Sequence, residues 1–321
     1  MIETNYENLW VLSMTEQGSQ VNQVSQETQW TVLALLDWTK GYLEKNDSES
    51  PRLDAEILLA HSMNCERIML YTRFDEIVSE TDRLQFRELV KQRASGCPVA
   101  YLVGFKEFYS LRFDVSEYVL IPRPETEFAV IAVLDIVKKY FSSDSSEQSI
   151  PCHVIDVGTG SGAIAITLAT EMPQIQVTAV DLSTVALEVA RKNATCHEVN
   201  DQIEFVEQDL LSGPSNNKFD IVVSNPPYVT SEEYEALSRN VREYEPQLAL
   251  ESGPTGMECY QRLVPQAAER LNDGGWLVLE TSPMLMEQLK MLVVENGFDE
   301  ISTVSDLAGH PRIVTARRVN G

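Results

Sequence analysis

The chain has 321 residues, and its 49 Asp and Glu residues outnumber its 25 Lys and Arg residues, which gives a formal net charge of −24. Nucleic-acid binding draws its affinity from Lys and Arg at the phosphates, so this balance argues against a direct nucleic-acid partner and suits a basic protein partner. No apolar run approaches the ~18 residues of a membrane span, and no Lys precedes Lys40, so we expect a cytoplasmic protein without a membrane anchor.

The cysteines and histidines predict neither a disulfide framework nor a metal site. The 5 cysteines and 4 histidines are widely scattered along the chain, and no C-x-x-C pair occurs. Cysteines in this arrangement fit a reducing cytoplasm.

Two regions precede the part of the chain in which strands are expected. Residues 1–28 are rich in Gln, Asn, Ser, Thr and Glu, and they predict a mostly disordered extension. Between residues 29 and 97 the apolar residues follow helical spacing, and Ser50-Pro51 opens the second helix. We expect a small helical bundle that recognises a substrate protein, because nothing in this region has a catalytic pattern.

Residues 98–122 are expected to connect the bundle to the rest of the chain. Apolar and polar residues alternate in Pro98–Gly104 and again in Phe108–Val115, which predicts a β-hairpin connector. The run Arg123-Pro124-Glu125-Thr126-Glu127 follows, and its two glutamates suit a helix N-terminus, where the helix dipole favours carboxylates. The polar stretch from Ser142 to Ser149 predicts a loop.

Residues 123–321 predict one α/β domain. The expected strands alternate with expected helices, which indicates a mostly parallel sheet that is covered on both faces. The loop from Asp306 to Pro311 is too short for a crossover helix, so the last strand should run antiparallel to its neighbour. The strands are expected at 152–157, 176–181, 203–207, 219–224, 275–280, about 298–304 and 311–318, and the helices at about 161–171, 184–195, 257–272 and 284–296.

A glycine-rich turn follows the first of these strands. Gly158, Gly160 and Gly162 permit a tight turn and a close approach of the backbone to a ligand, and the next helix offers free N–H groups. Asp181 ends the second strand, where a carboxylate can bind ribose hydroxyls. This pattern is common to proteins that bind NAD and proteins that bind S-adenosylmethionine.

Two acidic residues favour S-adenosylmethionine. Asp156 lies before the first glycine, where a carboxylate suits a cationic ligand better than a pyrophosphate, although it could instead only cap the turn. Asp209 follows the third strand, where it and an apolar neighbour could hold an adenine, unless it is a simple loop acid. The predicted cofactor-binding residues are Asp156, Gly158, Thr159, Gly160, Ser161, Gly162, Asp181, Asp209, Leu210 and Asn225.

The tetrapeptide Asn225-Pro226-Pro227-Tyr228 follows the fourth strand. Its two prolines stop the strand and remove two backbone donors. Asn225 Oδ1 and the Pro226 carbonyl can each accept a hydrogen bond from one planar NH2 group, and the Tyr228 ring can stack on its plane. The tetrapeptide therefore predicts a site for an amide or an amino-substituted base, and the alternative is an ordinary strand-ending loop.

These motifs occur in an order that resembles the class I S-adenosylmethionine-dependent methyltransferases of the HemK/PrmC type. The likeness runs from about Trp30 to Arg318 and includes the motif-like segments Glu245–Leu250 and Asp306–Arg312. Thr281-Ser282-Pro283-Met284 departs from the family, which usually has a Gly-containing turn and a Gln there. Sister enzymes that modify a ribosomal protein usually lack the Arg-Pro-Glu-Thr-Glu run, so this run points to the release-factor branch.

The resemblance implies a monomeric enzyme that transfers a methyl group from S-adenosylmethionine to a glutamine side-chain nitrogen, leaving S-adenosylhomocysteine. The glutamine is that of the Gly-Gly-Gln motif of peptide chain release factors. By resemblance, Asn225, Pro226 and Tyr228 are catalytic, and together with Pro227 they bind the substrate. The alternatives are a methyltransferase for a ribosomal protein, a non-catalytic adaptor, and an adenine-N6 nucleic-acid methyltransferase, whose flipped-out base presents the same NH2 group.

Overall fold

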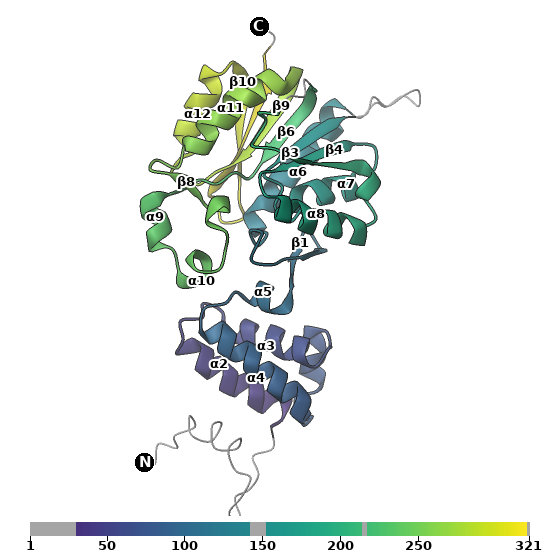
Figure 1. Ribbon diagram of the computed structural model, residues 1–321, viewed down its shortest axis with the longest axis vertical. Helices are drawn as coiled ribbons and strands as arrows, with labels where there is room; N and C mark the ends of the chain where they lie inside the picture. The colour runs from purple at the N-terminus through teal and green to yellow at the C-terminus, as the bar shows by residue number, and fades with distance from the viewer. Residues whose placement is uncertain (1–29, 142–151, 214–216, 320–321) are drawn as a thin grey trace, which may run out of the picture.

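The computed structural model describes residues 30–141, 152–213 and 217–319. The expected extension at 1–28 and the expected loop from Ser142 to Ser149 lie outside these residues. Figure 1 shows a group of N-terminal helices at one end and an α/β body at the other. No helix in the described part of the chain is both long and apolar enough to cross a membrane. The described residues also contain no cluster of His, Cys, Asp or Glu that could hold a metal ion.

The N-terminal helices pack around a core of their own, in which Leu35, Leu58 and Phe86 are fully buried. The Thr31 side chain caps the first helix and Ser79 caps the last long one, so both starts follow from the sequence. The elements of this region are α2 (Val32–Glu44), α3 (Pro51–Ser62), the 3-10 helix η1 (Arg67–Thr72), α4 (Glu80–Ala94) and the short α5 (Val99–Val103).

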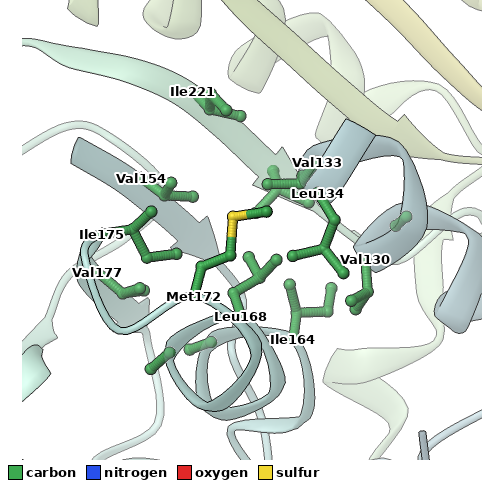
Figure 2. Packing of buried hydrophobic residues seen from close by; sticks show 14 of the residues in the cluster. Val130, Val133, Leu134, Val154, Ile164, Leu168, Met172, Ile175, Val177 and Ile221 are labelled. Atoms are coloured by element: carbon green, nitrogen blue, oxygen red, sulfur yellow. The ribbon is translucent and has the colours of Figure 1, made fainter. Parts of the chain in front are cut away.

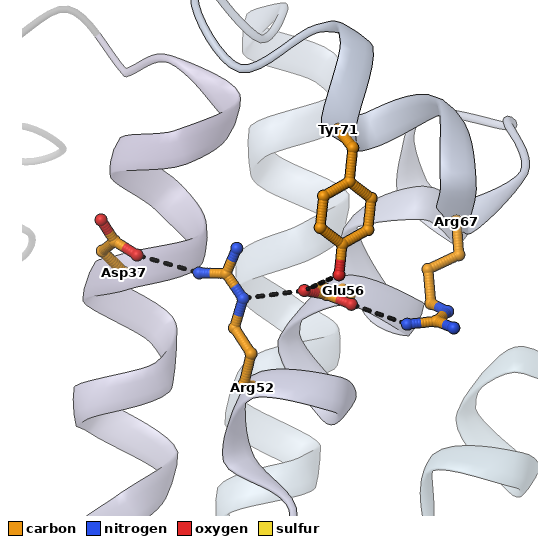
Figure 3. Close-up of polar contacts among 5 residues, drawn as sticks. All are labelled: Asp37, Arg52, Glu56, Arg67 and Tyr71. Atoms are coloured by element: carbon orange, nitrogen blue, oxygen red, sulfur yellow. Dashed lines mark hydrogen bonds and ion pairs between the residues drawn. The ribbon is translucent and has the colours of Figure 1, made fainter.

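A buried carboxylate joins α3 to η1. Glu56 is only 3% exposed, and it accepts hydrogen bonds from Arg52, Arg67 and the Tyr71 hydroxyl (Figure 3). These partners more than offset the burial and lower the pKa of Glu56. The network fixes η1 on the outside of the helical group, where Tyr71 stays half-exposed.

The connector is only partly the hairpin that the sequence predicts. Residues 99–103 form the helix α5 instead of a strand, because Gly104 closes one helical turn in the left-handed region at φ 82°. The hairpin begins after this glycine and pairs β1 (Phe105–Phe108) with β2 (Leu111–Asp114) in antiparallel register. The predicted strand at Pro98–Gly104 was therefore wrong.

The seven-stranded sheet has the order β10-β11-β9-β6-β3-β4-β5. Neighbours from β9 through β5 are parallel, and β11 runs antiparallel to both β9 and β10, which confirms the predicted reversal at the end of the chain. The strand expected at 275–280 starts earlier, at Leu271. The strands are β3 (His153–Val157), β4 (Gln176–Asp181), β5 (Ile203–Glu207), β6 (Phe219–Ser224), β9 (Leu271–Glu280), β10 (Phe298–Ser305) and β11 (Pro311–Arg318).

Helices cover both faces of this sheet, as predicted. Side chains alternate between faces along each strand, so Val154 enters one apolar cluster and its neighbour Ile155 enters the other. Figure 2 shows the first cluster, in which Val154 and Ile221 of the strands face Leu168 and other side chains of the covering helices. The first cluster takes in α6 (Glu127–Tyr140) and α7 (Ala163–Glu171), α8 (Thr184–Cys196) packs nearby, and α11 (Glu258–Arg270) and α12 (Met286–Glu295) cover the second face.

A long segment outside the seven-stranded sheet, residues 229–253, follows the Asn-Pro-Pro-Tyr tetrapeptide, and we call it the excursion. It brings Glu245 to the start of the α/β body, where the carboxylate accepts hydrogen bonds from Arg123 at 2.6 Å and from the backbone of Ile121 at 3.2 Å. These bonds join the excursion to the residues that open the α/β body. The elements of the excursion are β7 (Val229–Thr230), α9 (Ser231–Ala236), α10 (Arg239–Arg242), η4 (Gln247–Ala249) and β8 (Glu251–Gly253). Two short 3-10 helices lie earlier in the α/β body, η2 (Pro124–Thr126) and η3 (Asn200–Gln202).

Candidate active site

A cavity of about 350 Å³ lies at the carboxyl ends of β3, β4, β5 and β6. This is the edge at which open α/β sheets bind their ligands, and the volume is within the range of small-molecule sites. The connector contributes Tyr118 to the wall, and the excursion contributes Leu248. Six of the predicted cofactor residues line it, namely Gly158, Gly160, Asp181, Asp209, Leu210 and Asn225.

The glycine turn presents its backbone to this cavity. All three glycines are left-handed, with φ of 74° at Gly158, 54° at Gly160 and 84° at Gly162. A Cβ at Gly158 or Gly160 would point into open space, whereas one at Gly162 would come within 2.6 Å of Ile166. The first two glycines therefore leave room for a ligand, and the third lets α7 pack closely.

Asp181 braces the turn and also faces the cavity. Its Oδ2 accepts a hydrogen bond from the Gly160 N–H at 2.9 Å, and its Oδ1 accepts one from the Ser183 N–H at 2.9 Å. Burial raises the pKa of Asp181, while these backbone donors oppose the shift. The carboxylate is thus held at the place where the sequence predicts contacts with ribose hydroxyls.

Asp156 is fully buried and does not line the cavity. Its Oδ2 accepts hydrogen bonds from Thr159 Oγ1 at 2.7 Å and from the Ala165 N–H at 3.2 Å, so it supports the turn as the alternative interpretation proposed. Its Oδ1 has no partner among the described residues. Burial, with a smaller contribution from Asp181, raises the pKa of Asp156 to about 7. Thr159 and Ser161 are also buried and, like Gly162, do not line the cavity.

Asp209 follows the end of β5 and has a partner that the sequence did not predict. Asp209 Oδ2 pairs with Arg262 of α11 at 2.5 Å, and both side chains are substantially exposed. Leu210 follows in the left-handed region at φ 53°, where its carbonyl accepts a hydrogen bond from Gln208. Arg262 also lines the cavity, but it lies 53 residues from Asp209 in the sequence, and no local motif marks it.

The tetrapeptide reaches the same cavity through Asn225 and Pro227. Asn225 Nδ2 donates a hydrogen bond to Thr126 Oγ1 at 3.0 Å, which leaves Oδ1 as the accepting atom of the amide. Pro226 is buried, and Tyr228 packs against the second core cluster without lining the cavity. No described residue donates a hydrogen bond to Asn225 Oδ1 or to the Pro226 carbonyl.

A second buried carboxyl group lies behind the tetrapeptide. Glu280, at the end of β9, is only 1% exposed, and burial raises its pKa to about 7 although the hydroxyls of Thr126 and Tyr228 and the charge of Arg312 favour the ionised form. Its Oε2 has no partner among the described residues. Burial and the Glu280 charge raise the pKa of Tyr228 in turn. No motif in the sequence predicts a role for Thr126 or Glu280. Thr126 lies within the Arg123–Glu127 run, and Glu280 directly precedes the segment Thr281–Met284.

The cavity suits a ligand that combines hydroxyl groups with positive charge. Its wall carries the carboxylates of Asp181, Asp209, Glu251 and Glu258, of which Asp209 has the Arg262 partner described above. The open space at Gly158 and Gly160 is of the kind that a bound group would fill. The residues present therefore fit the ribose and the cationic groups of S-adenosylmethionine.

Comparison with known proteins identifies relatives over most of the chain. Residues 34–104 match the family model of the PrmC N-terminal domain, and residues 135–309 match that of the methyltransferase small domain. A release factor glutamine methyltransferase of Rhodopirellula baltica is 48% identical over 298 residues, which cover 92% of this chain and 99% of that protein. Another of Koribacter versatilis is 39% identical over 90% of this chain and 99% of that protein.

The solved structures show the shared fold. The catalytic domain of hMettl16, crystallised with a MAT2A 3′UTR hairpin, superposes with a TM-score of 0.52 at 18% identity. The superposition covers 73% of this chain and 83% of that chain. At this identity the likeness concerns the class I methyltransferase fold alone.

Proposed function

The chain belongs to the release factor glutamine methyltransferase family, and on this basis we propose that it methylates the glutamine of the Gly-Gly-Gln motif in peptide chain release factors. The observation that carries the proposal is the position of two unpaired acceptors, Asn225 Oδ1 and the Pro226 carbonyl. They follow β6, beside the cavity that the glycine turn lines. We propose that the reaction, like its release factor substrate, is cytoplasmic.

We propose S-adenosylmethionine as the methyl donor. The Gly158 and Gly160 backbone and the Asp181 carboxylate would hold its amino-acid and ribose parts, and Asp209 and Leu210 would hold its adenine. When it is bound, this cofactor supplies a methyl group that its positively charged sulfur activates. Asp156 lies beneath the turn and supports it through Thr159 and the Ala165 N–H.

The tetrapeptide supplies what a carboxamide nitrogen needs to react. The lone pair of that nitrogen is delocalised into its carbonyl, so the nitrogen is a poor nucleophile. Asn225 Oδ1 and the Pro226 carbonyl accept its two N–H groups and hold it in a fixed orientation, which removes much of the entropic cost of reaction. Both acceptors stabilise the positive charge that develops on nitrogen. Tyr228 follows Pro227 of the cavity wall, and we propose that its ring packs against the amide plane.

We propose the N-terminal helices as a docking surface for the release factor. Four large apolar side chains on α3 and η1 are exposed: Leu53, Ile68, Met69 and Tyr71. Ile68 is the most exposed of them, at 65%. Exposed large apolar side chains are common at protein interaction sites, and three of these four lie on the single short element η1. The net charge of −24 suits a basic partner protein, and we propose that the enzyme acts on it as a monomer.

The alternative substrates, nucleic acid and a ribosomal protein, fit the chain less well than a release factor does. An adenine amino group would present the same two hydrogens to Asn225 and Pro226, but a net charge of −24 disfavours contact with nucleic-acid phosphates. The Arg123–Glu127 run, expected in the release-factor branch, contributes Thr126 to the site itself. This contact favours a release factor over a ribosomal protein.

A transfer assay tests the proposal. The protein is incubated with methyl-labelled S-adenosylmethionine and a purified release factor, its Gln→Ala variant in the Gly-Gly-Gln motif, a ribosomal protein, or DNA and RNA. We expect label on the unaltered release factor alone. Label on nucleic acid alone, or equal label on the Gln→Ala variant, would overturn the proposal.

A further inference from the structure

The orientation of the Asn225 amide decides whether the site can work. An amide side chain has an accepting oxygen on one side and a donating NH2 on the other. With Oδ1 toward the substrate, Asn225 accepts one of the substrate N–H groups. Flipped by half a turn, it would set its own NH2 against that N–H, donor against donor. Something in the fold must therefore hold the amide in one orientation.

Thr126 contacts the other side of this amide. Its Oγ1 accepts the hydrogen bond from Asn225 Nδ2 at 3.0 Å, although the two residues lie 99 positions apart in the chain. Thr126 is only 5% exposed, so water does not compete freely for the same hydrogen bond. A hydroxyl has a single proton, and while Oγ1 accepts from Asn225 that proton must go to a different acceptor.

Glu280 is the acceptor that lies within reach of the Thr126 proton. The Thr126 hydroxyl faces its carboxyl group closely enough to favour the ionised form, and Oε2 of this carboxyl has no partner among the described residues. The other groups that face this carboxyl are the Tyr228 hydroxyl and Arg312, which also favour the charge, and Glu125, which opposes it. The Tyr260 hydroxyl donates its hydrogen bond to the Glu280 backbone carbonyl at 2.6 Å, so it does not donate to the carboxylate.

We propose that Thr126 and Glu280 are positioning residues, which hold the Asn225 amide with its oxygen toward the substrate nitrogen through a chain of hydrogen bonds from Asn225 to Thr126 to Glu280. The inference rests on the proposed function. An ionised Glu280 can only accept, so Thr126 must donate to it and accept from Asn225. A protonated Glu280 can donate to Thr126, which frees the Thr126 proton to bond Asn225 Oδ1 and allows the flipped amide.

Two variants of matched chemistry separate the hydroxyl from packing. Thr126→Val keeps the shape of the side chain and loses the hydroxyl, whereas Thr126→Ser keeps the hydroxyl and loses a methyl group. We expect Thr126→Val to lower kcat by about 10- to 100-fold, the range for residues that orient a ligand-binding group, with the affinity for S-adenosylhomocysteine unchanged. Thr126→Ser should recover most of the lost kcat. Turnover is measured on a release factor, and affinity is measured by calorimetry.

The pH profile provides a readout that simple packing would not change. In the unaltered protein kcat should fall as the pH drops below about 7, because Glu280 becomes protonated. Glu280→Gln, which cannot ionise, should have a low kcat that does not change across this range, and so should Thr126→Val. If Thr126→Val fails to bind S-adenosylhomocysteine, the kcat of Glu280→Gln is measured across the same pH range instead, and the same low, pH-independent kcat is expected.

The outcomes distinguish this inference from the proposed function. An unaltered protein that does not methylate the release factor would overturn the function, and the inference with it. An active unaltered protein would overturn the inference alone if Thr126→Val kept normal kcat, if Thr126→Ser lost as much as Thr126→Val, or if Glu280→Gln kept the acid limb of the profile.

Discussion

The two halves of the site are built differently. We call the part that would hold the methyl donor the donor half, and the part that would hold the methylated nitrogen the acceptor half. The donor half is made largely of backbone: the left-handed Gly158 and Gly160 face the cavity, and Asp181 at a neighbouring strand end accepts a hydrogen bond from the Gly160 N–H. The acceptor half combines the local Asn225-Pro226 segment with Thr126, which bonds to Asn225 across 99 residues. The donor half is therefore largely a local motif, whereas the support of the acceptor half exists only in the folded chain.

The two halves share one feature. Each has a buried carboxyl group behind it, Asp156 for the donor half and Glu280 for the acceptor half, with a pKa raised to about 7 by burial and one oxygen without a partner among the described residues. Buried charge that is not fully paired costs stability. Buried groups of this kind are typical of functional sites, which agrees with the roles proposed for the two halves.

The largest expected effect is confined to the acceptor half. Asn225→Ala removes the accepting oxygen and should lower kcat by at least about 10²- to 10³-fold, as the loss of one transition-state hydrogen bond does in other enzymes. S-Adenosylhomocysteine should still bind, because the glycine turn and Asp181 remain. Single-turnover transfer and calorimetry measure the two effects, and near-normal turnover of the variant would contradict this role of Asn225.

The donor half should respond in affinity rather than in turnover. Gly160→Ala places a methyl group in the space open to a ligand and should weaken S-adenosylhomocysteine binding by about 10- to 100-fold, the equivalent of 1–3 kcal/mol of overpacking. Gly309→Ala is the matched control, since Gly309 also has positive φ and open space beyond its Cβ but does not line the cavity. Equal affinities for the two variants would contradict the assigned role of Gly160.

The buried carboxyl groups should make stability depend on pH. Because the folded pKa of Asp156 is raised, the folded state binds more protons than the unfolded state between its ordinary pKa and about 7, so the free energy of unfolding falls as the pH rises through that window. Asp156→Asn cannot ionise and should be more stable than the unaltered protein at pH 8, by on the order of 4 kcal/mol. The two proteins should converge near pH 4, and urea unfolding at both pH values measures the difference. A constant difference would show that Asp156 does not titrate in this way.

The smallest effect is expected at the exposed pair beside the cavity. Arg262→Gln removes the partner of Asp209, and exposed ion pairs contribute about 0.2–1 kcal/mol, so S-adenosylhomocysteine affinity should change by less than about 5-fold. Calorimetry at low and high salt checks this value. A larger loss would assign Arg262 a direct contact with the ligand.

The same difference between the halves decides how much the sequence could predict. The sheet, its reversed last strand and the glycine turn follow from periodicity and spacing, and the structure confirms them. The role of Glu280 could not be predicted, because a lone glutamate at a strand end carries no signal until folding buries it beside Thr126. The error at Pro98–Gly104 arose because a short apolar run fits a strand and one helical turn equally well.

The most direct measurement of the central claim is the location of the transferred methyl group. A release factor is treated with the unaltered protein or with Asn225→Ala and S-adenosylmethionine, and its peptides are analysed by fragmentation mass spectrometry. We predict one added methyl group on the side-chain nitrogen of the Gly-Gly-Gln glutamine, present with the unaltered protein and absent with Asn225→Ala. A methyl group on another residue, or equal modification by the variant, would contradict the account.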